Sequence, residues 1–206
     1  MRIYLASTSP ARLATLRAAG IEPVVVPSLV DEDAAVENAA PRTPVELVEL
    51  LARLKAEAVA SVGVAGGEPI DGFILGGDSA FELDGAVYGK PHTPEVARER
   101  WQLQRGRTGT LHSGHWLIDH RGGHVRNGAG AVSSAQVTFA GDITDRELDA
   151  YIATGEPLHV AGAFTIDSLG APFITSVSGD PHAVVGLSLA TLRSLLRSFG
   201  VGWDQL

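Results

Sequence analysis

The spacing of apolar residues along the chain predicts strands and helices that interleave. Short apolar runs bounded by turn residues are typical of strands, and apolar residues three or four apart are typical of helices. We expect strands at Arg2–Ala6, Val24–Val26, Phe73–Leu75, Thr110–Asp119, Val132–Phe139 and Pro172–Ser178, and a hairpin over Phe81–Tyr88 that turns at Asp84–Gly85. The strand at Val24–Val26 is expected to be short and buried, and Gly63–Gly72 to be a glycine-rich connector. We expect helices at Pro10–Gly20, Pro44–Val62, Pro94–Arg105, Thr144–Gly155 and Ser188–Phe199. Because the elements interleave without strict alternation, the pattern predicts an α/β fold with a mixed sheet and flanking helices.

One expected helix carries a charged residue on its apolar face. At 100° per residue, one stripe of the helix collects the apolar residues Val48, Leu51, Ala58, Val59 and Val62. Lys55 falls inside this stripe. Two interpretations stay open: the stem follows the apolar surface and the ammonium reaches water, or the ammonium faces inward and needs an anionic partner. The acidic segment Val30–Pro44 contains two prolines and is expected to be a loop.

Composition and charge narrow the classes of partner. The chain has 206 residues, which is enough for one large domain or two packed lobes. It has no Cys, no basic-then-apolar leader and no apolar run of about 18 residues, so we expect a cytoplasmic protein that does not span a membrane. The net charge of −8 argues against a nucleic-acid duplex as partner, because a phosphate backbone binds a basic surface. A small phosphorylated ligand stays open.

A hydroxyl-rich turn precedes the first expected helix. Ser7, Thr8 and Ser9 lie between a strand and a helix N-terminus, where free N–H groups and the helix dipole favour anions. Arg12 adds a guanidinium that can donate two hydrogen bonds to phosphate. The other interpretation is simply a well-capped helix. The spacing of a P-loop is absent.

Two groups of carboxylates are candidates for metal or proton chemistry. Asp31, Glu32 and Asp33 form an acidic run, which is a solvated surface unless a ligand is bound there. Asp78 follows a short apolar strand and two glycines, so we expect it at a strand's C-terminal end, where open α/β sheets place ligands. It can bind Mg²⁺, orient a water or merely cap a turn.

The remaining candidates are weaker. Lys90 lies in an extended Gly-Lys-Pro turn and carries little alone. His112 and His115 are three residues apart in an expected strand, which puts them on opposite faces and argues against a zinc site.

Together, these segments resemble the Maf family of nucleotide pyrophosphatases over nearly the whole chain. The matching motifs, in order, are Leu5–Arg12, Val30–Glu32, Lys55–Ala56, Gly77–Ser79, Gly89–Pro91, Gly155–Pro157, Val160–Phe164 and Val185–Leu189. The resemblance implies a single domain over residues 1–206, with two lobes around a long cleft, similar to the inosine-triphosphate pyrophosphatases. It also implies a homodimer.

The resemblance assigns roles to the candidate residues. Asp78 matches the family's catalytic acid, which acts as general base and metal ligand. Asp31 matches a metal-binding carboxylate, with Glu32 beside it, and the implied metal is Mg²⁺ or Mn²⁺. The residues implied to bind substrate are Ser7, Ser9, Arg12, Lys55, Lys90 and Asp167.

The chain departs from the family pattern at three places. Ala11 replaces the first of two arginines, His159–Val160 replaces an Asp-Lys pair, and Asp167 replaces a Gln. These changes leave the base preference open, so the expected substrates are nucleoside triphosphates in general, non-standard ones included.

The implied reaction is attack of water at the α-phosphorus, which releases a nucleoside monophosphate and pyrophosphate. Two alternatives stay open. One is a phosphatase that removes the terminal phosphate. The other is a nucleotide-binding regulator of cell division or septum formation without significant turnover.

Overall fold

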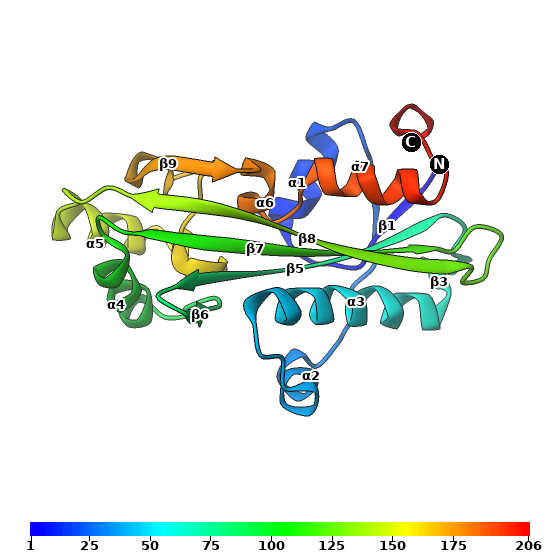
Figure 1. Ribbon diagram of the computed structural model, residues 1–206, viewed down its shortest axis with the longest axis horizontal. Coiled ribbons are helices and arrows are strands. Elements are labelled where there is room, and N and C mark those ends of the chain that lie inside the picture. Colours follow the sequence, from blue (N-terminus) through cyan, green and yellow to red (C-terminus); the bar gives the residue numbers. More distant parts are fainter. The chain divides into compact units, whose positions relative to one another are not determined.

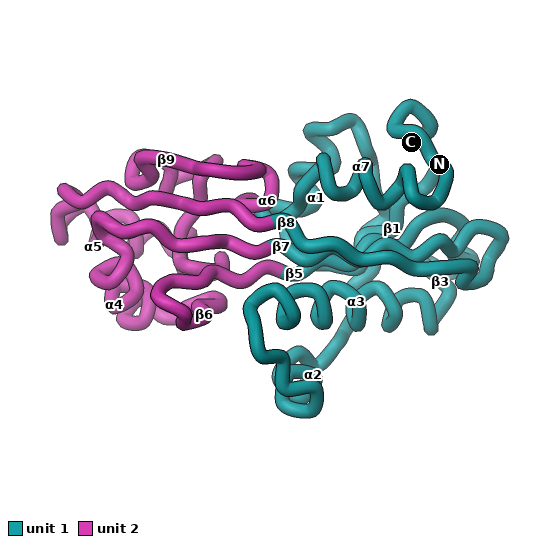
Figure 2. Tube along the Cα trace, viewed as in Figure 1, with its two compact units in different colours: residues 1–78, 113–133, 186–206 teal, residues 79–112, 134–185 magenta.

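The computed structural model describes residues 1–206, which divide into two compact units (Figure 2). The first unit contains Met1–Asp78, Ser113–Ser133 and Gly186–Leu206. The second contains Ser79–His112 and Ser134–Val185. Three long strands supply residues to both units: β5 (Phe73–Leu83), β7 (Thr108–Asp119) and β8 (Asn127–Phe139).

A seven-stranded mixed sheet confirms the predicted fold class. The hydrogen-bonded order is β2-β1-β5-β7-β8-β9, and β6 pairs with β5. β1 (Ile3–Leu5) runs parallel to both β2 (Val24–Val25) and β5. β6 (Ala86–Tyr88) is antiparallel to β5, and β9 (Ile174–Gly179) is antiparallel to β8. The sheet therefore mixes both pairings, as expected when helices and strands do not alternate strictly.

Helices cover both faces of the sheet in the first unit. α3 (Pro44–Val62) lies on one face, and α1 (Pro10–Ala18) and α7 (Leu189–Ser198) lie on the other (Figure 1). Strand alternation divides the core accordingly. Ile3 and Leu5 pack among leucines of α1 and α7, while Tyr4, between them in the chain, packs with Ala56 and Val59 of α3.

The ends of the predicted helices follow from their capping residues. In each of the five, a Ser or Thr side chain accepts a hydrogen bond from a backbone N–H in the first turn, and these residues are Ser9, Thr43, Thr93, Thr144 and Ser188. Two of these five helices are α4 (Pro94–Gln104) and α5 (Asp145–Ala153). At the start of α5, Thr144 and Glu147 form a capping box. No helix of the structure combines the length and the apolar character needed to cross a bilayer.

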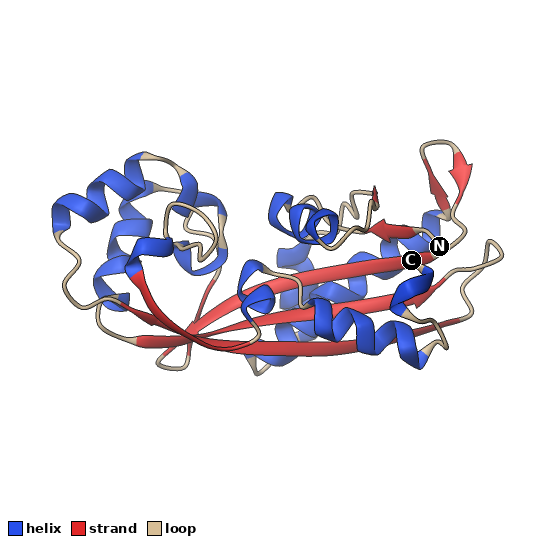
Figure 3. Cartoon of the chain, turned by 90° about the horizontal axis from the view of Figure 1, so that it is seen from above, coloured by secondary structure: helices blue, strands red, loops and turns tan.

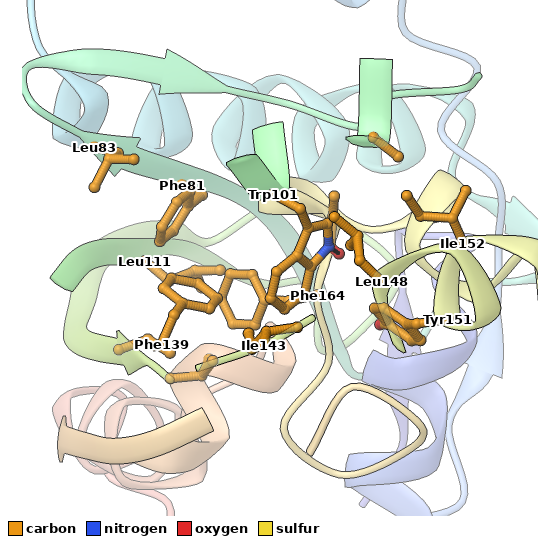
Figure 4. Close-up of a cluster of buried hydrophobic side chains, with 14 of the residues drawn as sticks. Phe81, Leu83, Trp101, Leu111, Phe139, Ile143, Leu148, Tyr151, Ile152 and Phe164 are labelled. Carbon is orange, nitrogen blue, oxygen red and sulfur yellow. Dashed lines mark hydrogen bonds between the residues drawn. The ribbon is translucent and has the colours of Figure 1, made fainter. Parts of the chain in front are cut away.

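An aromatic core holds the second unit together. Trp101 of α4 is fully buried, donates its indole N–H to the Ala163 carbonyl at 2.7 Å and meets Phe139 edge to face (Figure 4). Phe81 and Phe164 extend this T-shaped packing. α4 and α5 pack against each other (Figure 3). A short helix, α6 (Pro181–Val185), follows β9 and has no counterpart in the sequence prediction.

The acidic segment predicted as a loop contains a helix instead. α2 (Glu32–Ala39) begins after Asp31, whose side chain accepts a hydrogen bond from the Ala34 amide at 3.0 Å. Acidic residues in the first turn favour a helix because they complement its dipole. None of its residues is buried. The helix therefore has no apolar stripe that a sequence pattern could have revealed.

Three other expectations were wrong in detail. β2 was expected to be buried, but Val24 and Val25 are 39% and 40% exposed. Val62 ends the predicted apolar stripe of α3 and is 69% exposed, because α3 ends there and Gly63 caps it. The glycine-rich connector after α3 folds into a small antiparallel hairpin, β3 (Val64–Ala65) with β4 (Glu68–Pro69).

The predicted strand at Phe73–Leu75 does not end at its glycines. β5 continues without a break to Leu83, so Asp78 lies inside a strand rather than just after one. The glycines serve close packing: a Cβ atom at Gly76 would lie 2.0 Å from the Ala52 carbonyl oxygen of α3. The hairpin turn predicted at Asp84–Gly85 is confirmed, and both residues have positive φ, as a type I′ hairpin turn requires.

Candidate active site

Two consecutive glycines let side chains approach β5 from both faces. Gly76 faces α3, so strand alternation turns Gly77 to the opposite face and Asp78 back toward α3. A Cβ atom at Gly77 would lie 3.1 Å from the Arg12 Nε atom. Because neither glycine has a side chain, Arg12 can approach the backbone of β5 from one face while Lys55 approaches from the other.

Lys55 links two carboxylates from different segments. Its ammonium lies 2.6 Å from Asp78 Oδ1 and 2.7 Å from Glu32 Oε1. The Lys55 side chain is 9% exposed, that of Asp78 is 14% exposed and that of Glu32 is 50% exposed. The ammonium is thus buried and paired, which confirms the interpretation that this lysine faces inward. The alternative, in which the Lys55 ammonium reaches water, is excluded.

The turn before α1 is closed by its own side chains. Ser7 Oγ accepts hydrogen bonds from the Ser9 amide at 3.2 Å and from Arg12 Nη1 at 3.0 Å. Ser9 Oγ accepts one from the Arg12 amide at 3.4 Å. Arg12 Nε also donates to the Gly186 carbonyl at 2.9 Å. The predicted hydroxyl-rich turn exists, and Arg12 is held within it.

Burial changes the pKa of Arg12 more than the neighbouring carboxylates do. Loss of water lowers the pKa of the Arg12 guanidinium, and the nearby carboxylates of Asp78 and Glu32 partly offset that effect. An arginine pKa lies so far above neutrality that the group stays charged. The first unit therefore brings two buried cations, Arg12 and Lys55, close to the same pair of carboxylates.

The carboxylates suit a hard divalent cation. Glu32 and Asp78 already converge on one positive charge, the Lys55 ammonium, and oxygen ligands are those that Mg²⁺ and Mn²⁺ prefer. The Asp31 carboxylate lies at the N-terminus of α2, where it caps the helix. No group of three or more His, Asp or Glu side chains in residues 1–206 is arranged as a metal site. Mg²⁺ is commonly held by one or two carboxylates together with phosphate oxygens, so a pair is a sufficient protein contribution.

A family comparison identifies the chain. The profile of the family described as "Maf-like protein" matches residues 2–199. The chain belongs to the Maf family. A nucleoside triphosphate pyrophosphatase of Leifsonia xyli is 68% identical over 210 residues, which cover 100% of this chain and 96% of that protein. One of the same name from Corynebacterium diphtheriae is 48% identical over 97% of this chain and 95% of its own length.

One solved structure shows a remote likeness to this Maf protein. The Ham1 protein of Staphylococcus aureus aligns with 68% of this chain and 73% of its own, at 14% identity and a TM-score of 0.40. A similarity at this level carries no conclusion about function.

Two residues that the Maf resemblance assigned to substrate binding belong to the second unit. Lys90 and Asp167 are both exposed. The Lys90 turn is held through its neighbour Gly89, whose carbonyl accepts a hydrogen bond from Arg100 Nη1 at 2.5 Å. All the other predicted site residues lie in the first unit.

The sequence motifs gave no role to Glu156, yet it organises the loop that carries Asp167. Its carboxylate accepts hydrogen bonds from Tyr151 Oη at 3.0 Å, from Thr165 Oγ1 at 2.6 Å and from the Gly170 amide at 3.2 Å. Partial burial alone would raise the pKa of Glu156, but hydrogen bonds from Ser168, Thr165 and Tyr151 side chains outweigh burial and lower that pKa. The Gly-Glu-Pro motif is therefore a loop anchor in the second unit of this Maf protein.

Proposed function

We propose that this Maf protein is a nucleoside triphosphate pyrophosphatase, which converts a nucleoside triphosphate and water to the monophosphate and pyrophosphate. The curated relatives carry that name at up to 68% identity over the whole chain. The observation that carries the proposal is the buried Lys55 ammonium, which pairs with the carboxylates of Asp78 and Glu32 next to the Ser7–Arg12 turn. Such a group joins anion-binding cations to a carboxylate that can accept a proton.

The proposed mechanism is an in-line attack of water on the α-phosphorus. The water oxygen forms the new bond, the bond from the α-phosphorus to the bridging oxygen breaks, and pyrophosphate leaves with that oxygen. Asp78 accepts the proton of the attacking water. Arg12 and Lys55 offset the negative charge that develops on the phosphate oxygens, and Ser7 and Ser9 keep the turn in place around them.

A divalent cation completes the proposed site. Glu32 and Asp78 would hold Mg²⁺ or Mn²⁺, with Asp31 assigned to the same role by family resemblance. When bound, the cation would polarise the phosphate oxygens. Lys55 would then serve two anionic groups, the carboxylates and the substrate phosphates.

The remaining assignments are part of the same proposal. We assign Lys90 to the phosphates, because its exposed ammonium suits an anion, and Asp167 to the nucleoside. Family resemblance supports a cytoplasmic homodimer. Nucleoside triphosphates in general, non-standard ones included, are the proposed substrates.

Replacement of the proposed base tests the function. Asp78→Asn keeps the side chain's shape and removes its charge, so turnover of a nucleotide panel with Mg²⁺ or Mn²⁺ should fall by at least about 10²-fold, the usual contribution of a general base. Asp142→Asn, at an exposed position of the second unit, is the matched control and should keep wild-type rates. Activity of Asp78→Asn within about tenfold of wild type would refute the assignment. Binding of nucleotides by the wild type without turnover would favour the regulatory alternative.

A further inference from the structure

His115 is a buried residue on the face of β7 that points away from α3. Its neighbour Gly114 faces α3, because a Cβ atom there would lie 2.2 Å from the Val48 carbonyl oxygen. Strand alternation therefore turns His115 to the opposite face, the one covered by α1 and α7. Its side chain is fully buried. A buried imidazole needs hydrogen-bond partners, because burial of a polar group is otherwise unfavourable.

The hydrogen bond of His115 defines what the imidazole does. Its Nε2 atom accepts from the Ser188 amide, with 2.8 Å between the two nitrogens. A ring nitrogen that accepts an N–H carries no proton itself, so Nε2 must be the unprotonated nitrogen. The imidazole thus serves as a fixed acceptor for the main chain at the start of α7.

The same stretch of main chain also contacts the proposed phosphate-binding arginine. Gly186, two residues before Ser188, accepts a hydrogen bond from Arg12 Nε at 2.9 Å. Leu187, between them, is fully buried. Ser188 in turn caps α7 through its hydroxyl, which accepts from the Thr191 amide at 3.0 Å. The turn 186–188 is therefore held by His115 at one end and by Arg12 at the other.

We infer that His115 is a positioning residue for Arg12. It fixes the turn 186–188, and the carbonyl of that turn orients the guanidinium beside Gly77 and Ser7. All of these residues belong to the first unit. The inference rests on the proposed function, in which Arg12 binds the phosphates of the substrate.

Substitution by Phe and by Gln separates positioning from simple packing. His115→Phe keeps a ring of similar size and removes the acceptor. We expect it to weaken binding of a nucleoside triphosphate analogue with a methylene bridge between the α- and β-phosphorus on the order of tenfold. That is less than the roughly 10²-fold that a misplacement of 1 Å can cost a reaction. In the hydrolysis of an ordinary nucleoside triphosphate, the same variant should mainly raise KM. His115→Gln places an acceptor oxygen near the Nε2 position and should restore binding, whereas His115→Asn, whose oxygen is nearer the backbone, should not.

A second buried histidine of the same strand region provides the control. His120 is 3% exposed, lies in the first unit and hydrogen-bonds the Ile70 carbonyl through Nδ1 at 3.0 Å. None of its hydrogen bonds reaches the turn 186–188. His120→Phe should lower thermal stability without changing analogue affinity.

A double-mutant cycle with Arg12→Met gives the deciding result. If His115 acts through Arg12, His115→Phe should have no further effect on analogue binding in the Arg12→Met background. Equal losses in both backgrounds, or an affinity of His115→Phe equal to that of His120→Phe, would overturn the inference. Should His115→Phe fail to fold, the contrast between Gln and Asn at this position still decides, because equal affinity of those two variants contradicts a role for the Nε2 acceptor. A wild-type protein that neither binds nor hydrolyses any nucleoside triphosphate would instead refute the proposed function.

Discussion

The pairing of Lys55 with Asp78 makes a quantitative prediction for Lys55→Met. Methionine keeps most of the lysine stem and removes the ammonium, so the Asp78 carboxylate, which is 14% exposed, loses the cation that is hydrogen-bonded to it. Removing one partner of a fully buried ion pair costs about 3–5 kcal/mol. The second pair, with Glu32, is half exposed and adds little, because exposed pairs contribute about 0–1 kcal/mol. Since Asp78 keeps some contact with water, we expect a loss of about 2–3 kcal/mol.

Thermal unfolding measures this loss directly. For a chain of this size, about 1 kcal/mol corresponds to a change in Tm of roughly 2–4 °C, so Lys55→Met should lower Tm by roughly 4–12 °C. Arg53→Met is the matched control: Arg53 pairs with Glu57 at 2.7 Å on the same helix, but the two side chains are 54% and 42% exposed. Its Tm should change by no more than about a third as much.

A cycle with Asp78→Asn shows whether the charge is the cause. Asp78→Asn in the Lys55→Met background removes the unpaired charge, so the double variant should be less destabilised than the sum of the two single variants, by at least about 1 kcal/mol. Additivity within about 0.5 kcal/mol, together with a wild-type Tm for Lys55→Met, would refute the argument and would mean that the lysine contributes only its stem.

Two further predictions follow from the packing of β5 and from the loop anchor. Gly76→Ala should lower stability by about 1–3 kcal/mol, because the new methyl group meets the α3 backbone at 2.0 Å, whereas Gly141→Ala, with its nearest contact at 3.5 Å, should be neutral in the same thermal assay. The anchor Glu156 has a lowered pKa in the folded state, so its contribution is present above the unfolded pKa of about 4.3 and is lost as pH falls through the folded value. In urea unfolding, the stability advantage of wild type over Glu156→Gln should therefore shrink as pH falls below about 5 and through the lowered folded-state pKa, and a constant difference would contradict the assignment.

Local signals predicted the helices well. Capping residues and apolar spacing are properties of neighbouring residues, so the beginnings of α1, α3, α4, α5 and α7 could be located from the sequence. α2 could not, because nothing on it is buried and its stability signal is only a capped, acidic first turn. The two glycines of β5 look like the end of a strand in the sequence. Only the approach of α3 and Arg12 shows that they are needed within it.

The part of the candidate site that could be predicted is the charged residue on an apolar helix face. Lys55 stands out because a charge lies on an apolar stripe, and the structure supplies the anionic partner that this position demands. Glu32 as the second partner of Lys55 depends on a contact between distant segments, and so does the hydrogen bond between His115 and Ser188. Strand alternation predicts which face a histidine takes. It says nothing about a partner 73 residues away.

The position of bond cleavage tests the central claim most directly. Incubation of the wild-type protein with a nucleoside triphosphate and Mg²⁺ or Mn²⁺ in ¹⁸O-labelled water, followed by chromatography and mass spectrometry, identifies the products and the atom that received the water oxygen. Attack at the α-phosphorus predicts nucleoside monophosphate that carries the label, unlabelled pyrophosphate and no diphosphate intermediate. A nucleoside diphosphate with labelled inorganic phosphate as first products would contradict the proposed function and would support a terminal phosphatase.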